Sequence, residues 1–316
     1  MTTLHSNSST RLAATRTWLL AALVCSVPVI WGQGFALRFG AEILLIGTAV
    51  MSLNLLIGVG GLVSLGHGAV FGCAAYAAAV AAQAWGGNVV LVLAVGVLAG
   101  MAVAGLMALL TLRSTGLFFL VLTLVAGQMA WEVVFRWREV TGGADGLRGF
   151  PSLEAFGIRL DTPAALYLVT CLIAGLAWWV LRSFARAPVG LALQGMRDQP
   201  LRMRALGYSL GNLRVRAFLV SGAVAGAAGA LFPFVNQYIG PNTVHWSMSA
   251  TLVIMSVLGG IHMLLGGFAG AAVYLLAQTQ LSSYTDRWQL AIGLLFVATV
   301  MFAPNGLLRL GRRGRP

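Results

Sequence analysis

Long apolar runs dominate this chain, and they leave it few folds other than a bundle of membrane-spanning helices. Of its 316 residues, 59% are hydrophobic and 9% are charged, whereas soluble domains are about 45–50% apolar and about 25% charged. The 40 glycines fit the same class, because small residues let helices pack closely within a bilayer. The sequence therefore predicts an all-α, polytopic membrane protein.

Ten apolar segments of roughly 17–25 residues match the length that a helix needs to cross a bilayer. They lie at 17–36, 40–59, 64–85, 88–112, 115–137, 164–182, 216–235, 247–265, 267–285 and 288–303. We therefore expect about ten transmembrane helices in one membrane domain at 18–303, between an N-terminal tail at 1–17 and a basic C-terminal tail at 304–316.

Arginines set the expected orientation, since short cytoplasmic loops carry an excess of positive charge. Residues 182–216 hold seven of the 20 basic residues and a single acid, Asp198. With ten spans, this segment, Arg113 and both tails fall on one side, which predicts cytoplasmic termini in a bacterial inner membrane. The loop at 138–163, with four of the eight acids, falls on the outer side.

The inner loop, at about 183–215, has an order of its own. Pro200 suits the first turn of a helix and Gly207 suits a helix end, so we expect two short helices at about 188–196 and 200–206. A basic segment of this form suits docking of a cytoplasmic protein. The alternative is a loop that contacts only lipid head groups.

The usual marks of catalysis are missing from the sequence. The four histidines are scattered, there is no GxxxxGK[ST] phosphate loop, and the three cysteines lie far apart without a CxxC pair. The arginines flank apolar runs and form no stripe interleaved with aromatic residues. We expect no catalytic residue, metal or cofactor, no ATP hydrolysis by this chain itself, and no nucleic-acid partner.

Isolated polar side chains inside the apolar segments have two possible roles, since they either tie helices together or line a translocation path. The candidates for the path are Asn54, Ser64, His67, Thr123 and Gln128. Glu42 and Glu132 lie near segment ends, where Glu132 is also one turn from Arg136. A proton-coupled carrier would need several carboxylates at depth, so this class is disfavoured.

A weak internal echo joins 57–72 to 257–270. The glycines that recur at a fixed offset are Gly60, Gly61 and Gly68, matched by Gly259, Gly260 and Gly267. Transporters are often built from repeats, although a glycine-rich chain gives such matches easily.

Seven blocks in order carry a family resemblance. They are NLLIGVGGLVSLGHGAVFGCAAY at 54–76, LTLVAGQ at 122–128, TGGADGL at 141–147, RAPVGLALQGMRDQPLRMRALG at 186–207, AFLVSGAVAGAAGALF at 217–232, LGG…GGFAGA at 258–271 and APNGLL at 303–308. Together, over about residues 40–310, the chain resembles the permease subunits of branched-chain amino acid ABC importers, the LivM type.

The resemblance implies a ten-helix permease of the large, type II-like ABC importer fold. Its expected partners are a homologous second permease, two cytoplasmic ATPase subunits and a periplasmic substrate-binding protein, which the outer loop around 141–146 would help to capture. The ATPase would dock on the 186–207 block, where the matching residues are Arg186, Pro188, Gly190, Arg197, Asp198, Arg202, Arg204 and Gly207.

The chain departs from the family pattern at two places. Gln199 and Pro200 stand where the family carries Asn-Glu, and His262 and Met263 interrupt its glycine-rich block. Close relatives carry urea, short amides or aromatic acids, so those substrates remain alternatives to branched-chain amino acids. A stand-alone secondary transporter is the other alternative.

Overall fold

The computed structural model describes residues 34–155, 157–285, 287–302 and 306. The expected helix at 17–36, apart from its last three residues, lies outside this part of the chain. So do the tails at 1–17 and 304–316, apart from Gly306.

Six helices are long and apolar enough to cross a membrane within the described residues. They are α2 (Gly34–Asn54), which continues into the π-helical turn η1 (Leu55–Val59), α3 (His67–Trp85), α4 (Val89–Leu110), α5 (Gly116–Arg136), α7 (Pro163–Arg186) and α10 (Leu210–Asn236). Each coincides with an expected apolar segment. The prediction of a polytopic, mainly helical membrane protein is confirmed to this extent.

The last three expected segments are helical too, but they do not establish the count of ten spans. They form α11 (Trp246–Gly259), α12 (Gly266–Tyr284) and α13 (Trp288–Phe302), of which α11 has 14 residues and α13 has 15. Helix α11 ends six residues before the expected boundary at 265. There Gly260 adopts a φ of 108°, which glycine tolerates better than other residues, and a turn at 260–265 follows.

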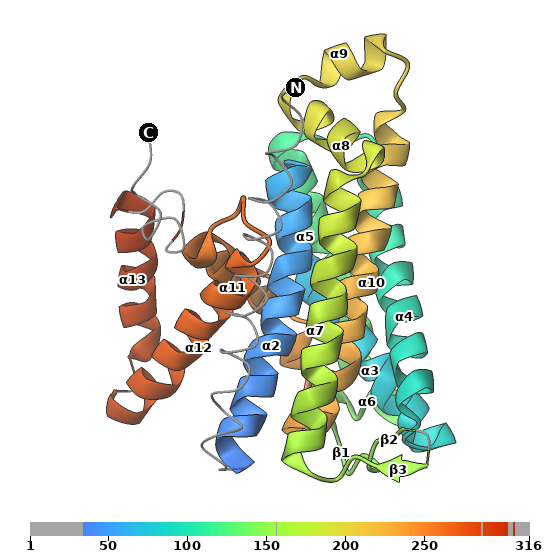
Figure 1. Ribbon diagram of the computed structural model, residues 1–316, viewed down its shortest axis with the longest axis vertical. Helices are drawn as coiled ribbons and strands as arrows, with labels where there is room; N and C mark the ends of the chain where they lie inside the picture. Colours follow the sequence, from blue (N-terminus) through green and yellow to red (C-terminus); the bar gives the residue numbers. More distant parts are fainter. Residues whose placement is uncertain (1–33, 156, 286, 303–305, 307–316) are drawn as a thin grey trace, which may run out of the picture.

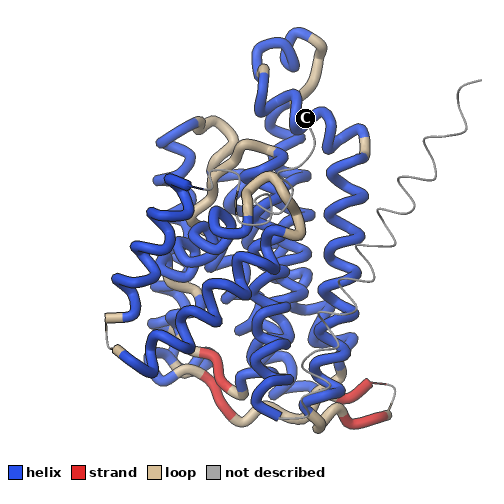
Figure 2. Tube along the Cα trace, turned by 60° about the vertical axis from the view of Figure 1, so that its left-hand side comes forward, coloured by secondary structure: helices blue, strands red, loops and turns tan. Residues whose placement is uncertain are grey.

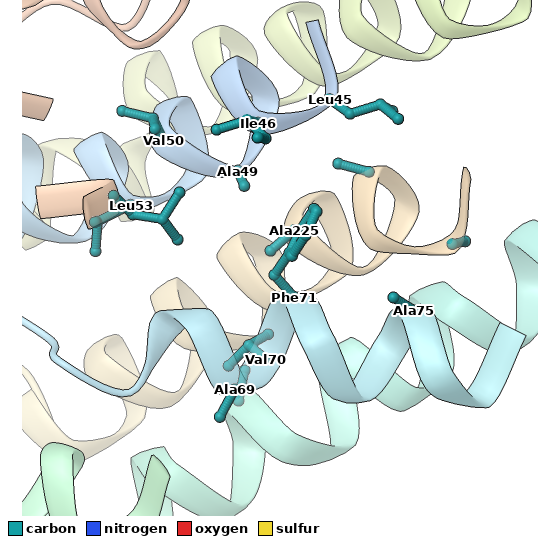
Figure 3. Packing of buried hydrophobic residues seen from close by; sticks show 14 of the residues in the cluster. Leu45, Ile46, Ala49, Val50, Leu53, Ala69, Val70, Phe71, Ala75 and Ala225 are labelled. Atoms are coloured by element: carbon teal, nitrogen blue, oxygen red, sulfur yellow. The ribbon is translucent and has the colours of Figure 1, made fainter. Parts of the chain in front are cut away.

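The centre of the bundle is formed by α2, α3 and α10, whose apolar windows are mostly buried, whereas those of α4, α5 and α7 are mostly exposed. In Figure 3, Leu45, Ala49 and Leu53 of α2 lie near α3, and Phe71 of α3 lies beside Ala225 of α10. All five side chains belong to one hydrophobic cluster. The exposed faces of the outer helices suit contact with lipid or with another subunit.

Glycines let α4 approach α10 closely. Gly96 and Gly100 on α4 face Gly222 and Gly226 on α10, and a Cβ added to Gly100 would lie 2.7 Å from the Gly226 Cα. Both pairs have the four-residue spacing by which membrane helices pack backbone to backbone.

The loops sort to two opposite ends of the bundle (Figures 1 and 2). At one end lie α8 (Pro188–Asp198) and α9 (Pro200–Ala205). At the other end are the short elements α6 (Arg138–Thr141), η2 (Gly143–Asp145), β1 (Leu147–Arg148), β2 (Glu154–Ala155), β3 (Ile158–Arg159), β4 (Tyr238–Ile239) and η3 (Pro241–Thr243).

Two antiparallel ladders, β1 with β4 and β2 with β3, are the departure from a purely helical fold in the described residues. The Glu154 amide also donates to the Gly87 carbonyl at 2.7 Å, so the expected outer loops meet at one end. The grouping of loops agrees with the arginine pattern. Which end faces the cytoplasm stays a prediction.

Candidate coupling surface and translocation residues

Helix α8 lies on the end of the bundle with one face buried. Proline occupies its first turn, which suits a helix start. Its buried residues are Gly190, Ala192, Leu193 and Met196. A Cβ at Gly190 would meet the Phe184 and Ala185 carbonyls, so this glycine permits close contact with the end of α7. The expected helix at 188–196 is thus present and runs to Asp198.

Helix α9 is the more exposed of the two short helices. It buries Met203 and exposes Arg202, Arg204 and Leu201, the last with 78% of its surface accessible. Gln199 precedes it without a side-chain capping bond, and Gly207 follows with a φ of 85°. The predicted stop at Gly207 is therefore observed. Arg186 and Pro188 are also exposed, so most of the expected docking residues are accessible to a partner.

Arg197 differs from the other arginines of this segment because it points into the protein. Its Nη1 donates to the Gly58 carbonyl, in η1. Its Nε donates to the Asp198 carboxylate at 2.8 Å, and this hydrogen bond lowers the pKa of Asp198. The Arg197 side chain is 32% exposed, against 60% for Asp198. Direct contact of Arg197 with an ATPase stays a prediction; the bond to Gly58 is an internal one.

The turn at 60–66 fits closely under α8. Gly61 has a φ of 66°, and a Cβ there would overlap the Arg197 Cγ. A Cβ at Gly60 would lie 3.4 Å from Leu193. Movement of α8 therefore presses directly on the end of η1 and on this turn.

A second glycine-rich turn, at 260–265, contacts the end of α2 and η1. A Cβ at Gly58 would overlap the Ile261 carbonyl, and Asn54 Nδ2 donates to the Met263 carbonyl at 3.1 Å. Ser256 of α11 donates to Asn54 Oδ1. The two segments of the sequence echo thus occupy similar helix–turn–helix positions and lie against each other.

Four of the five candidate path residues are buried and hydrogen-bonded. Besides the bonds of Asn54, His67 Nε2 bonds the Ser52 hydroxyl at 2.7 Å, Ser64 Oγ accepts from the Gly66 amide, and Thr123 Oγ1 accepts from the Leu65 amide at 3.1 Å. These bonds join α2, α3, α5, α11 and the two turns. Such contacts suit ties between helices, and a role in permeation stays a prediction.

Gln128 is different, because its Oε1 is buried without a hydrogen-bond partner among the described residues. The same holds for the Tyr76 hydroxyl and for Trp131 Nε1, of which Trp131 lies one turn from Gln128 on α5 and packs edge-on to the His245 ring at 5.2 Å. Buried polar atoms normally find partners, so these three have capacity for a solute or water. Tyr76 and Trp131 were not predicted, since in an apolar segment an aromatic residue looks like core.

The comparisons with known proteins decide the family. A family model described as branched-chain amino acid transport system / permease component matches residues 35–303. This chain belongs to that family. The permease resemblance drawn from the seven blocks is confirmed, and the family together with the apolar helices makes the chain a multi-pass membrane transport protein rather than an enzyme.

Curated relatives agree with the family. The high-affinity branched-chain amino acid transport system permease protein LivM of Escherichia coli strain K12 is 26% identical over 285 residues, covering 83% of this chain and 67% of the relative. LivM of Salmonella typhimurium strain LT2 matches with the same identity and coverage. A probable LivH permease of Methanocaldococcus jannaschii is 22% identical over 54% of this chain and 55% of its own length. No solved structure matches the chain significantly.

Proposed function

We propose that this permease is a subunit of an ATP-binding cassette importer in the bacterial inner membrane. With a homologous second permease it forms the path for branched-chain amino acids, which a periplasmic binding protein delivers. The match of residues 35–303 to the permease family carries this proposal, and the names of the LivM relatives support the substrate class.

Two cytoplasmic ATPase subunits supply the energy, and one of them docks on α8 and α9. The exposed cations Arg186, Arg202 and Arg204, with the exposed apolar Leu201, support this assignment. Basic and apolar side chains together suit a partner with carboxylates around a small apolar contact.

Arg197 passes the movement of the docked ATPase to the membrane helices. Its bond to the Gly58 carbonyl and the contact of Gly58 with Ile261 support a mechanical link from α8 to both glycine-rich turns. The π-helical turn η1 suits this role, because π-helical turns interrupt the regular ladder of a helix and occur often at functional sites.

Gln128, Tyr76 and Trp131 contribute polar contacts to the substrate path. A branched-chain amino acid has charged ends and an apolar side chain, and it needs a few donors and acceptors on largely apolar walls. One unpaired acceptor, one hydroxyl and one indole N–H meet that need.

Purification through a tag on this chain, followed by uptake in proteoliposomes, tests the function. We expect a second permease, an ATPase and a binding protein to co-purify, and uptake of labelled leucine that excess isoleucine and valine suppress. Suppression by urea, acetamide or phenylalanine, with isoleucine and valine ineffective, would reassign the substrate.

A further inference from the structure

A cationic cavity of about 420 Å³ opens at the α8–α9 end of the bundle, between the α4–α5 loop and the start of α10. Its lining residues are Leu112, Arg113, Thr115, Arg204, Tyr208, Ser209, Leu210, Gly211 and Arg214. Three arginines and three hydroxyl groups line it, and no acidic residue does. The composition of the wall favours an anion.

The three arginines have no carboxylate partner among the described residues. Arg214 is fixed in place, because its Nη1 donates to the Ser114 carbonyl at 2.8 Å and to the Leu112 carbonyl at 3.3 Å. Its Nε is buried and unpaired within the same part of the chain. Arg113 and Arg204 are exposed. One anchored guanidinium and two movable ones can converge on a phosphate, the group that arginine binds with paired hydrogen bonds.

The first turn of α10 adds to the positive potential. Ser209, Leu210 and Gly211 start this helix of 27 residues and also line the cavity. The amides at a helix start carry partial positive charge and point outward along the axis. The helix thus supports the same ligand chemistry as the arginines.

A second, mainly apolar cavity of about 510 Å³ adjoins the first and shares Thr115, Arg204, Leu210 and Arg214 with it. The apolar residues of its wall are Leu62, Val63, Leu117, Phe119, Leu120, Met196, Pro200, Leu201 and Leu210. Leu117 is 75% exposed, so the apolar wall is open to its surroundings. A free phosphate ion has no use for such a wall, whereas an acyl chain does.

We propose that the two cavities together hold one anionic phospholipid. Its phosphate lies among Arg113, Arg204 and Arg214, and the start of an acyl chain follows Leu117 and Leu201. Basic pockets between membrane helices on the cytoplasmic side bind anionic head groups in this way. The proposal rests on the proposed function only in taking the α8–α9 end as cytoplasmic. The bound lipid would join the α4–α5 loop to the coupling segment.

Native mass spectrometry of the full chain in detergent, with added dioleoyl phosphatidylglycerol or dioleoyl phosphatidylcholine, tests the site. We expect the wild type to retain phosphatidylglycerol in preference. The affinity should fall about 5-fold in Arg113→Gln and about 30-fold in Arg113→Gln/Arg204→Gln, because each arginine near a lipid surface contributes a comparable attraction. The control Arg38→Gln/Arg138→Gln removes two exposed arginines at the opposite end and should stay within about twofold of the wild type.

Other occupants give different results. Equal retention of the two lipids, or unchanged phosphatidylglycerol affinity in the double variant, would overturn the proposal. Displacement of the lipid by millimolar inorganic phosphate would assign the cavity to a soluble anion and overturn it as well. Loss of ATPase association in Arg113→Gln with lipid affinity intact would assign it to a protein carboxylate instead. Since the readout is bound lipid, failure of amino acid uptake would leave this result unaffected.

Discussion

Replacing Arg197 by methionine separates the internal contact of α8 from its exposed surface. Methionine keeps an unbranched stem against Gly61 but removes the guanidinium that donates to the Gly58 carbonyl. A hydrogen bond from a charged group contributes about 1.5–3 kcal/mol. Because 32% of the side chain is exposed, we take the lower end, about 1.5 kcal/mol, which corresponds to roughly tenfold in an equilibrium.

The expected result is a loss of coupling without a loss of assembly. The exposed arginines at 186, 202 and 204 remain in Arg197→Met, so the ATPase should still co-purify and hydrolyse ATP. Without the bond to Gly58, movement of α8 is passed on less well, and leucine uptake per ATP hydrolysed should fall roughly tenfold. The assay is initial uptake and phosphate release, measured together in proteoliposomes that hold the purified importer.

Asp198→Asn is the matched control. Asp198 accepts only from the Nε of Arg197 and is exposed, so its loss leaves the Gly58 contact in place. The hydrogen bond lowers the pKa of Asp198; the ion pair is therefore present at neutral pH and is lost only as the pH falls through that lowered pKa. Near-normal coupling is expected for Asp198→Asn. Equal losses in the two variants, or normal uptake per ATP in Arg197→Met, would refute the role given to Arg197.

Three further predictions follow from the packing and the loop arrangement. Gly100→Val should lower stability by about 1–3 kcal/mol through overpacking, because the Gly226 backbone faces it, whereas Gly175→Val, with open space around it, should not; thermal unfolding in detergent measures both, and equal midpoints would contradict the α4–α10 contact. Asn54→Leu should lower the unfolding midpoint by the equivalent of about 1–2 kcal/mol, since it removes bonds to Ser256 and Met263; an unchanged midpoint would argue against the tie. Reporter fusions after residues 146 and 204 should report opposite sides of the membrane, and the same side for both would overturn the orientation.

Apolar length predicted where the helices are, because a long run without charge has few alternatives in a bilayer. It did not predict the end of α11 at Gly259, since the residues that follow, Ile261 and Leu264 among them, are as apolar as the helix itself. Hydropathy reports preference for lipid or core and not the backbone angles, so a turn within an apolar run is invisible to it. By contrast, the ion pair of Glu132 with Arg136 follows from their spacing on one helix.

The candidate site divides in the same way. Pro200 and Gly207 act locally, so the two short helices of the 183–215 loop were predictable. The inward direction of Arg197 was not, because its partner Gly58 lies 139 residues away. The bond of Asn54 to Ser256 spans 202 residues and was equally hidden. Which polar residues are tied and which, like Gln128, remain unpaired is decided by such long-range packing.

The most direct test of the central claim compares energy sources in one uptake assay. Proteoliposomes that hold this chain alone, under a proton or sodium gradient, should show no uptake of leucine, because the expected carboxylates at depth are missing from its apolar segments. Vesicles that hold the whole importer should accumulate leucine only with binding protein outside and ATP inside. Gradient-driven uptake by this chain alone would contradict its assignment as the permease subunit of an ATP-driven importer.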